Sequence, residues 1–119
     1  MAMKVQPITE HEQEAVAMAG AVGVRMRMLI GPADAAPNFH MRHFTVEPGG
    51  HTPHHQHDYE HEVLILSGTA LLKSEAGDRE AGKNDVVFVP ANEKHQFRNA
   101  GSEPLEFICL IPAPQDCAQ

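Results

Sequence analysis

The residues of this chain that could do chemistry are histidines, and most of them lie in one stretch. The 119-residue sequence contains nine histidines, and seven of them fall between His40 and His61. Histidine is the commonest metal ligand in proteins, through a neutral ring nitrogen. A cluster of this density predicts a metal site.

Spacing selects the candidates for one shared site. His55 and His57 are two residues apart, so an extended strand would point both side chains to one face. His61 follows four residues later and keeps that parity, whereas Glu62 has the opposite parity. Three imidazoles make a partial metal shell, and His95, the one histidine in the second half of the chain, is the candidate for the fourth ligand.

Four other residues are candidates for the surroundings of this site. Arg42 has apolar neighbours on its strand face, and its guanidinium could hold the carboxylate of a substrate or form a structural salt bridge. Phe107 and Cys109 share one face of the last strand, where they would line a pocket or pack in the core. Tyr59, the one tyrosine, could gate the mouth of the site.

Short strands are the elements expected to position these side chains. Residues 22–30 alternate in a pattern typical of a half-buried strand, and no long helical period appears. Short strands separated by Gly, Pro and Asn turns predict an all-β sandwich or barrel. Further strands are expected at residues 39–46, 63–68, 69–74, 85–90, 95–99 and 105–111, with a tight turn at 48–50.

Composition limits the remaining classes. A chain of this length forms one domain, and it has neither an apolar run long enough to span a membrane nor a signal-peptide core at its start. The net charge of −7 without a Lys/Arg cluster argues against nucleic acid or anionic membrane as a partner. Cys109 and Cys117 are expected to be free thiols in a reducing cytoplasm.

Two motifs in the chain resemble those of the cupin superfamily. The first has a glycine, five residues, His-x-His, a glutamate and a closing glycine, and here His61 stands at the position of that glutamate. In the second motif, asparagine replaces both glycines, and asparagine tolerates the positive φ that such turns need. The matching residues are Gly49, His55, His57 and Gly68 in the first motif and Asn84, Pro90, Asn92, His95 and Asn99 in the second.

The chain also resembles the small four-histidine, manganese-binding monocupins of that superfamily, through Arg42, residues 44–50, 60–62 and 109–112. This resemblance implies a single-domain cupin jelly-roll β-barrel at residues 22–113. It implies one divalent ion per chain, with manganese first and iron, nickel or zinc as alternatives. The ligands would be His55, His57, His61 and His95. Imidazole suits several of these ions, so spacing alone does not name the metal.

The flanking segments have their own expected roles. Residues 1–21 are expected to form an N-terminal arm that could exchange onto a neighbour's sheet edge and cover it. Residues 114–119 are expected to form a flexible tail. Jelly-roll monocupins often pair through edge strands, so a homodimer is expected.

Three function hypotheses remain open. The first is a metal-dependent oxidoreductase that uses dioxygen or peroxide on a small organic substrate, because four neutral imidazoles leave the +2 charge of the ion uncompensated and two positions of an octahedral ion open. The second is a non-redox lyase or isomerase of a sugar acid or keto acid, with the metal as Lewis acid and Arg42 on the carboxylate. The third is a binding module without turnover.

Overall fold

Nine strands and two short 3-10 helices make up residues 2–113, the part of the chain that this computed structural model describes. Those residues form no α-helix, and therefore no helix with the length and apolar character needed to cross a membrane. The predicted tail at 114–119, with Cys117, lies outside the described residues. The strands are β1 (Gln13–Ala15), β2 (Val22–Ile30), β3 (Phe39–His51), β4 (His61–Ser67), β5 (Thr69–Ser74), β6 (Arg79–Gly82), β7 (Val86–Val89), β8 (His95–Asn99) and β9 (Leu105–Pro112), and the 3-10 helices are η1 (Ile8–Glu10) and η2 (Pro32–Asp34).

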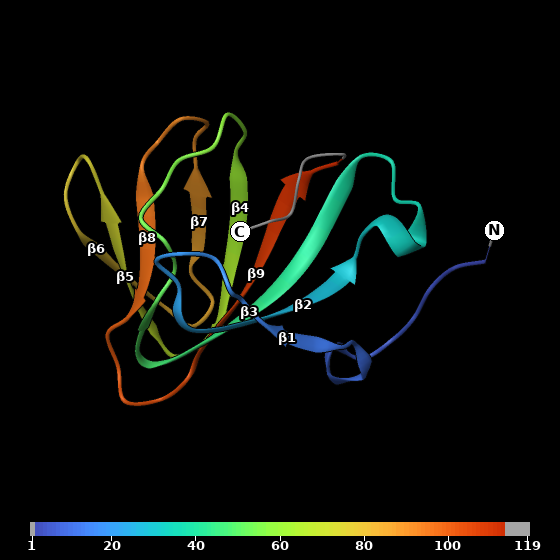
Figure 1. The fold of residues 1–119 in the computed structure, drawn as a ribbon, viewed down its shortest axis with the longest axis horizontal. Helices are drawn as coiled ribbons and strands as arrows, with labels where there is room; N and C mark the ends of the chain where they lie inside the picture. Colours follow the sequence, from blue (N-terminus) through green and yellow to red (C-terminus); the bar gives the residue numbers. More distant parts are fainter. Residues whose placement is uncertain (1, 114–119) are drawn as a thin grey trace.

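The strands form two layers joined by β3, as Figure 1 shows. The first half of β3 pairs with β9 and β2, and its last residue, His51, pairs with β8. One layer therefore runs β2-β3-β9-β4-β7 and the other β3-β8-β5-β6. The strands β6 and β7 each pair on one side only, so the barrel is open between them. The expected all-β jelly-roll barrel is confirmed.

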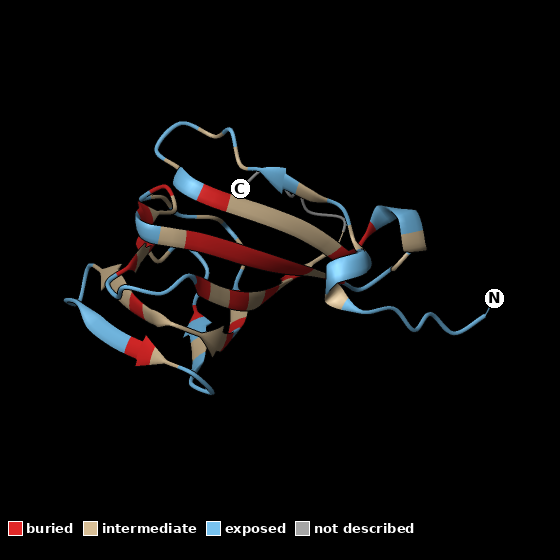
Figure 2. Cartoon of the chain, turned by 90° about the horizontal axis from the view of Figure 1, so that it is seen from below, coloured by how far each residue is buried: buried red, intermediate tan, exposed pale blue. Residues whose placement is uncertain are grey.

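The core lies between the layers. Along β9 every second residue is buried, from Leu105 to Ile111, as the alternation predicts. The ring of Phe107 stacks between Phe44 and Phe97, with centroid distances of 5.2 and 4.8 Å. Figure 2 shows buried residues concentrated on the central strands and exposed ones on the turns and the N-terminal segment.

The predicted tight turn at residues 48–50 is wrong, because β3 continues through it. The strand bends there instead. Gly49 has a φ of +82°, and the pairing of β2 with β3 shifts register between Val22 and Val24. A Cβ on Gly50 would lie 2.5 Å from the carbonyl oxygen of Val22, so only glycine lets the two strands approach this closely.

The two asparagines of the second motif occupy the turns as predicted. Asn84 has a φ of 73° and Asn92 a φ of 66°. These left-handed conformations are the ones that asparagine tolerates better than other non-glycine residues. The turns therefore form without the usual glycines.

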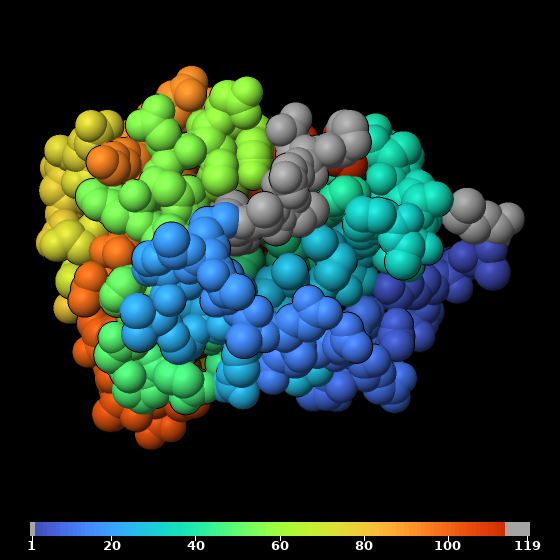
Figure 3. Space-filling view, viewed as in Figure 1, coloured from blue at the N-terminus to red at the C-terminus, as the bar shows by residue number. Residues whose placement is uncertain are grey.

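The N-terminal arm packs on its own barrel. Strand β1 pairs with β2 of the same chain, and the amide of Val16 donates to the carbonyl of Val24. Figure 3 shows this segment, in blue, lying across one face of the molecule beside the green segment that carries the histidine cluster. A Cβ on Gly20 would lie 3.4 Å from Pro53, so the arm packs closely against that segment.

Candidate metal centre

The four candidate histidines come from three places in the fold. His61 begins β4 and His95 begins β8. The other two do not lie on a regular strand, so the extended chain that the parity argument assumed for His55 and His57 does not form. Instead, two backbone hydrogen bonds tie His55 to His95, at 3.1 and 2.9 Å, and the amide of Asn92 donates to the carbonyl of His57 at 2.6 Å.

This backbone frame brings the four imidazole rings together. The centroid of the His57 ring lies 4.5 Å from that of His55 and 5.4 Å from that of His61. The ring of His95 lies 5.0 Å from that of His55 and 5.1 Å from that of His61. The spacing argument therefore selected side chains that do meet, although the strand assumed for it is absent.

The hydrogen bonds favour the ring tautomers that a metal requires. Nδ1 of His95 lies 2.9 Å from the carbonyl oxygen of Glu93, and a carbonyl can only accept, so this nitrogen carries the proton and Nε2 keeps its lone pair. Nδ1 of His61 lies 3.5 Å from Sγ of Cys109. Nε2 of His61 is buried without a hydrogen-bond partner, and such an atom is normally paired.

Electrostatics keep the two buried rings neutral. Burial, followed by the charges of His95 and Arg42, lowers the pKa of His61 from 6.5 to about 3. Burial also lowers the pKa of His95, although its bond to Glu93 opposes this. Neutral imidazole is the form that binds metals, so both rings are ready as ligands at neutral pH.

The cluster fits a divalent ion in its chemistry more closely than in its present arrangement. Across residues 2–113, no group of three or more His, Cys, Asp or Glu side chains is already arranged as a metal site. Support for metal binding at these four histidines therefore comes from their chemistry. The buried, unpaired nitrogen of His61 and the neutral state of both buried rings are what support it.

Behind the cluster, toward β3, β9 and β4, lies a small space. Arg42 is completely buried there, with Nη2 3.2 Å from Sγ of Cys109 and its guanidinium 5.0 Å above the ring of Phe44. Together with Phe107, His55, His61 and His95, these residues line a cavity of about 30 Å³, which has room for one or two water molecules. Arg42 thus lies inside the barrel, in the wall behind His61, and not at a mouth.

The other candidates lie at the edge of the cluster. The ring of Tyr59 stacks on that of His57 at 4.8 Å and approaches His61 at 5.5 Å. Glu62 pairs in register with Phe88 and Leu110 on the other face of β4 from the buried His61. Burial and a hydrogen bond to Glu60 raise the pKa of Glu62 to about 7.

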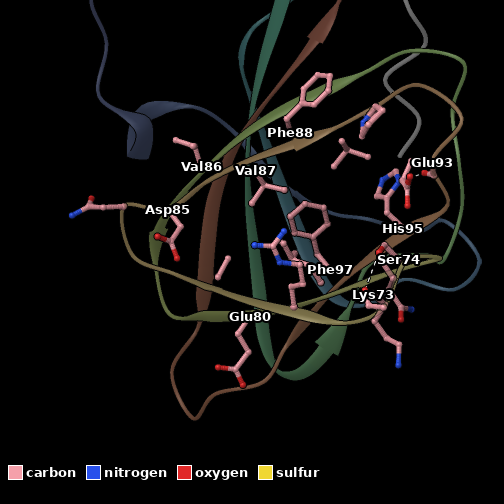
Figure 4. Close-up of a pocket in the computed structure, with 18 residues that line it drawn as sticks. Lys73, Ser74, Glu80, Asp85, Val86, Val87, Phe88, Glu93, His95 and Phe97 are labelled. Carbon is pink, nitrogen blue, oxygen red and sulfur yellow. Dashed lines mark hydrogen bonds between the residues drawn. The ribbon is translucent and has the colours of Figure 1, made fainter.

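A large cavity on the far side of His95 was missed by sequence reasoning. It measures about 600 Å³ and lies between β5, β6, β7 and β8 (Figure 4). His95 and Glu93 lie at one end of the view, Phe97 and Val87 face each other in the middle, and Asp85 lies at the other end. The strand alternation around Phe97 and Leu72 could have indicated an inward face, but not that the barrel stays open between β6 and β7.

The fold and the motif positions define the family. Residues 42–111, more than half of the chain, match the cupin domain family. The chain belongs to this family.

Relatives with named activities are diverse. The chain is 34% identical over 79 residues to 1-methylthio-D-xylulose 5-phosphate methylsulfurylase of Rhodospirillum rubrum, and the match covers 66% of this chain and 51% of that protein. The chain therefore spans about half the length of this curated relative. Its structure is similar to that of the polyketide cyclase RemF from Streptomyces resistomycificus, with 31% identity, a TM-score of 0.89 and coverage of 96% and 83% of the two chains. It is also similar to a protein described as a predicted oxalate decarboxylase from Thermotoga maritima, with 25% identity, a TM-score of 0.80 and coverage of 92% and 98%.

Proposed function

We propose that this cupin is a metal-dependent enzyme acting on a small organic substrate, with one divalent ion per chain held by His55, His57, His61 and His95. One observation carries the proposal: four imidazole rings lie together, and Nε2 of one of them, His61, is buried and unpaired. Burying a polar nitrogen without a partner costs free energy, and a metal ion would remove that cost. Manganese is the first candidate ion, and iron, nickel and zinc are the others.

The bound ion would supply Lewis-acid or redox chemistry, and the chain's own groups would prepare the site for it. Glu93 fixes the tautomer of His95 through its carbonyl oxygen. Cys109 contacts the other nitrogen of His61. Because all four ligands are neutral, the site would keep its full positive charge and would favour an anionic substrate.

Two reaction classes fit such a site. The first is an oxidoreductase using dioxygen or peroxide, since imidazole sets suit redox-active ions. The second is a non-redox lyase or isomerase, in which the ion is only a Lewis acid. The names of the similar proteins favour the second class, because a polyketide cyclase and a decarboxylase need no external oxidant.

Metal analysis tests this proposal. Protein purified without a metal-affinity resin should contain about one divalent ion per chain, and His61→Ala should lose it while keeping its β-sheet circular dichroism spectrum. Val63→Ala, a buried change two residues along β4, is the matched control and should keep the ion. Absence of metal from the wild type after reloading would overturn the proposal and leave a binding module.

The identity of the ion separates the two classes. Stoichiometric manganese or iron, with dioxygen or peroxide consumed when substrate is added, would support the oxidoreductase. Stoichiometric zinc, with turnover that persists under anaerobic conditions, would support the lyase or isomerase.

We also propose that the chain forms a homodimer through the outer face of the β2-β3-β9-β4-β7 layer. Leu64 is in register with Val86 and Ile108, and Val86 and Phe88 are 80% and 59% exposed. An exposed apolar row on a sheet face commonly marks an interface. Light scattering should give a dimer mass for the wild type and a monomer mass for Phe88→Glu, and a wild-type monomer would refute the idea.

A further inference from the structure

The cavity beside His95 has the size of a ligand site. Its volume of about 600 Å³ falls within the range of roughly 300–1,000 Å³ that is usual for small-molecule sites. His95 lines both this cavity and the small one behind the cluster. A molecule in the large cavity would therefore reach the histidine cluster from the open edge between β6 and β7.

The strand register builds one wall of this cavity. Phe97 on β8 pairs with Leu72 on β5, and Leu72 pairs with Arg79 on β6. Residues paired across neighbouring strands point to the same face of a sheet, so these three side chains form one row. Val87 of β7 faces Phe97 across the cavity (Figure 4). The row thus begins as an apolar surface and ends in a guanidinium.

The charges of the cavity leave that guanidinium available. Lys73 forms a salt bridge with Asp78 at 3.2 Å, and the carboxylate of Asp85 accepts a hydrogen bond from the amide of Gly82 at 2.8 Å. Glu80 and Glu93 also line the cavity, but Glu80 follows Arg79 directly on β6, so its side chain leaves from the opposite face of the strand, and Glu93 lies at the His95 end. Among residues 2–113, Arg79 makes no ion pair or side-chain hydrogen bond.

We propose that this cavity binds an organic anion with an apolar body. The body would lie along Phe97 and Leu72, the anionic group, a carboxylate or a phosphate, would pair with Arg79, and the other end would reach His95. Two strand spacings of about 4.8 Å separate β8 from β6, so the row is about 10 Å wide, enough for a fused pair of rings. Guanidinium binds both anions through paired hydrogen bonds.

This inference rests on the proposed function in one respect, since it names the substrate class of the same site. Its own support, however, does not include the metal. The apolar row, the open edge and the available guanidinium are features of the chain alone. The two proposals can therefore fail separately.

Binding of fused-ring probes tests the inference. Calorimetry on the purified protein would compare 2-naphthoate and 2-naphthyl phosphate with the uncharged 2-naphthamide. We expect both anions to bind at least about 10-fold more tightly than the amide. Whichever anion binds more tightly identifies the preferred group.

A matched pair of variants tests the role of Arg79. Arg79→Gln should weaken anion binding about 10-fold and leave amide binding unchanged. Arg98→Gln is the control, because it removes the same charge from a residue on the other face of β8, where Arg98 contacts Gln96. Arg98→Gln should bind both anions as the wild type does.

The outcomes are decisive in each direction. Equal binding of anion and amide, equal effects of the two arginine variants, or no saturable binding of any probe would overturn the inference. Repeating the titrations after chelator treatment separates it from the metal proposal. An Arg79-dependent anion site in a protein that never retains metal would sustain the inference and defeat the proposed function. A protein that retains metal but binds no anion through Arg79 would sustain the proposed function and defeat the inference.

Discussion

The two sides of the histidine cluster differ in almost every physical property. The inner side, toward β3, β4 and β9, leaves a space of only about 30 Å³ and includes the fully buried Arg42. The outer side, between β5, β6, β7 and β8, encloses about 600 Å³ and is edged by the exposed Arg79. One arginine is thus packed into the structure and the other is available at its edge.

The difference indicates that the two sides have different roles. Side chains on the inner side touch each other and a candidate ligand, so a change there should alter stability and the metal site together. Side chains on the outer edge touch few neighbours, so a change there should alter ligand choice alone. A jelly roll that is closed at β3 and open between β6 and β7 produces this asymmetry directly.

The largest expected effect comes from comparing the two arginines. Arg42→Ala should lower the free energy of unfolding by about 3 kcal/mol, because it empties a packed site and leaves buried partners unsatisfied. Arg79→Ala, at an exposed position, should stay within about 0.5 kcal/mol of the wild type. Urea denaturation of metal-free protein measures both. Similar losses for the two variants would break the comparison.

The second-largest effect is expected from acid, which should lower the free energy of unfolding through His61 on the inner side. The unfolded chain protonates His61 near pH 6.5, whereas burial holds its folded pKa at about 3. The unfolded state therefore binds more protons between these values, and stability falls as pH falls. One proton gives a slope of up to about 1.4 kcal/mol per pH unit, or about 2 kcal/mol between pH 6 and 4.5. Urea titrations of metal-free His61→Gln should show a slope shallower by nearly one proton, and parallel slopes would contradict the assignment.

The sequence predicted the inner side well because two periodicities specify it. Alternation along β9 and along the first half of β3 identifies the buried faces, and Arg42 and Cys109 are in register on them. The motif spacing found all four histidines and the two left-handed asparagines. These features depend on local geometry and on short, regular spacings, which a single sequence displays.

The outer side was not predicted, since it depends on which strands fail to pair. No sequence pattern in residues 79–89 indicates that β6 and β7 do not pair with each other. The spacing argument assumed an extended chain at His55 and His57. The hydrogen bonds between His55 and His95 that hold this segment instead connect residues 40 positions apart, which local spacing does not reveal. Arg79 had no signal of its own, since an exposed arginine after a hairpin is ordinary.

A smaller effect should follow from the contact between Cys109 and His61. Cys109→Ala should weaken metal binding about 10-fold, because partners of metal-bound histidines orient the ring. Competition with a chromogenic chelator measures this affinity. Ile111→Val, at another buried position on the same face of β9, should cost about 1 kcal/mol of stability without changing metal affinity. If both variants lose affinity equally, Cys109 acts only through packing.

The smallest expected effect lies at the turn that borders the outer cavity. Asn84 has a φ of 73°, and its backbone amide donates to the carbonyl of Ile65 at 2.8 Å. Asn84→Ala should cost about 1 kcal/mol, since a Cβ without a compensating side-chain contact is strained in this conformation, whereas Asn84→Gly should change stability by less than about 0.5 kcal/mol. Thermal unfolding measures both, and 2-naphthoate affinity should stay constant in both. A loss of affinity in Asn84→Gly would mean that the asparagine side chain itself contacts the ligand, which would extend the anion site from Arg79 to the turn before β7.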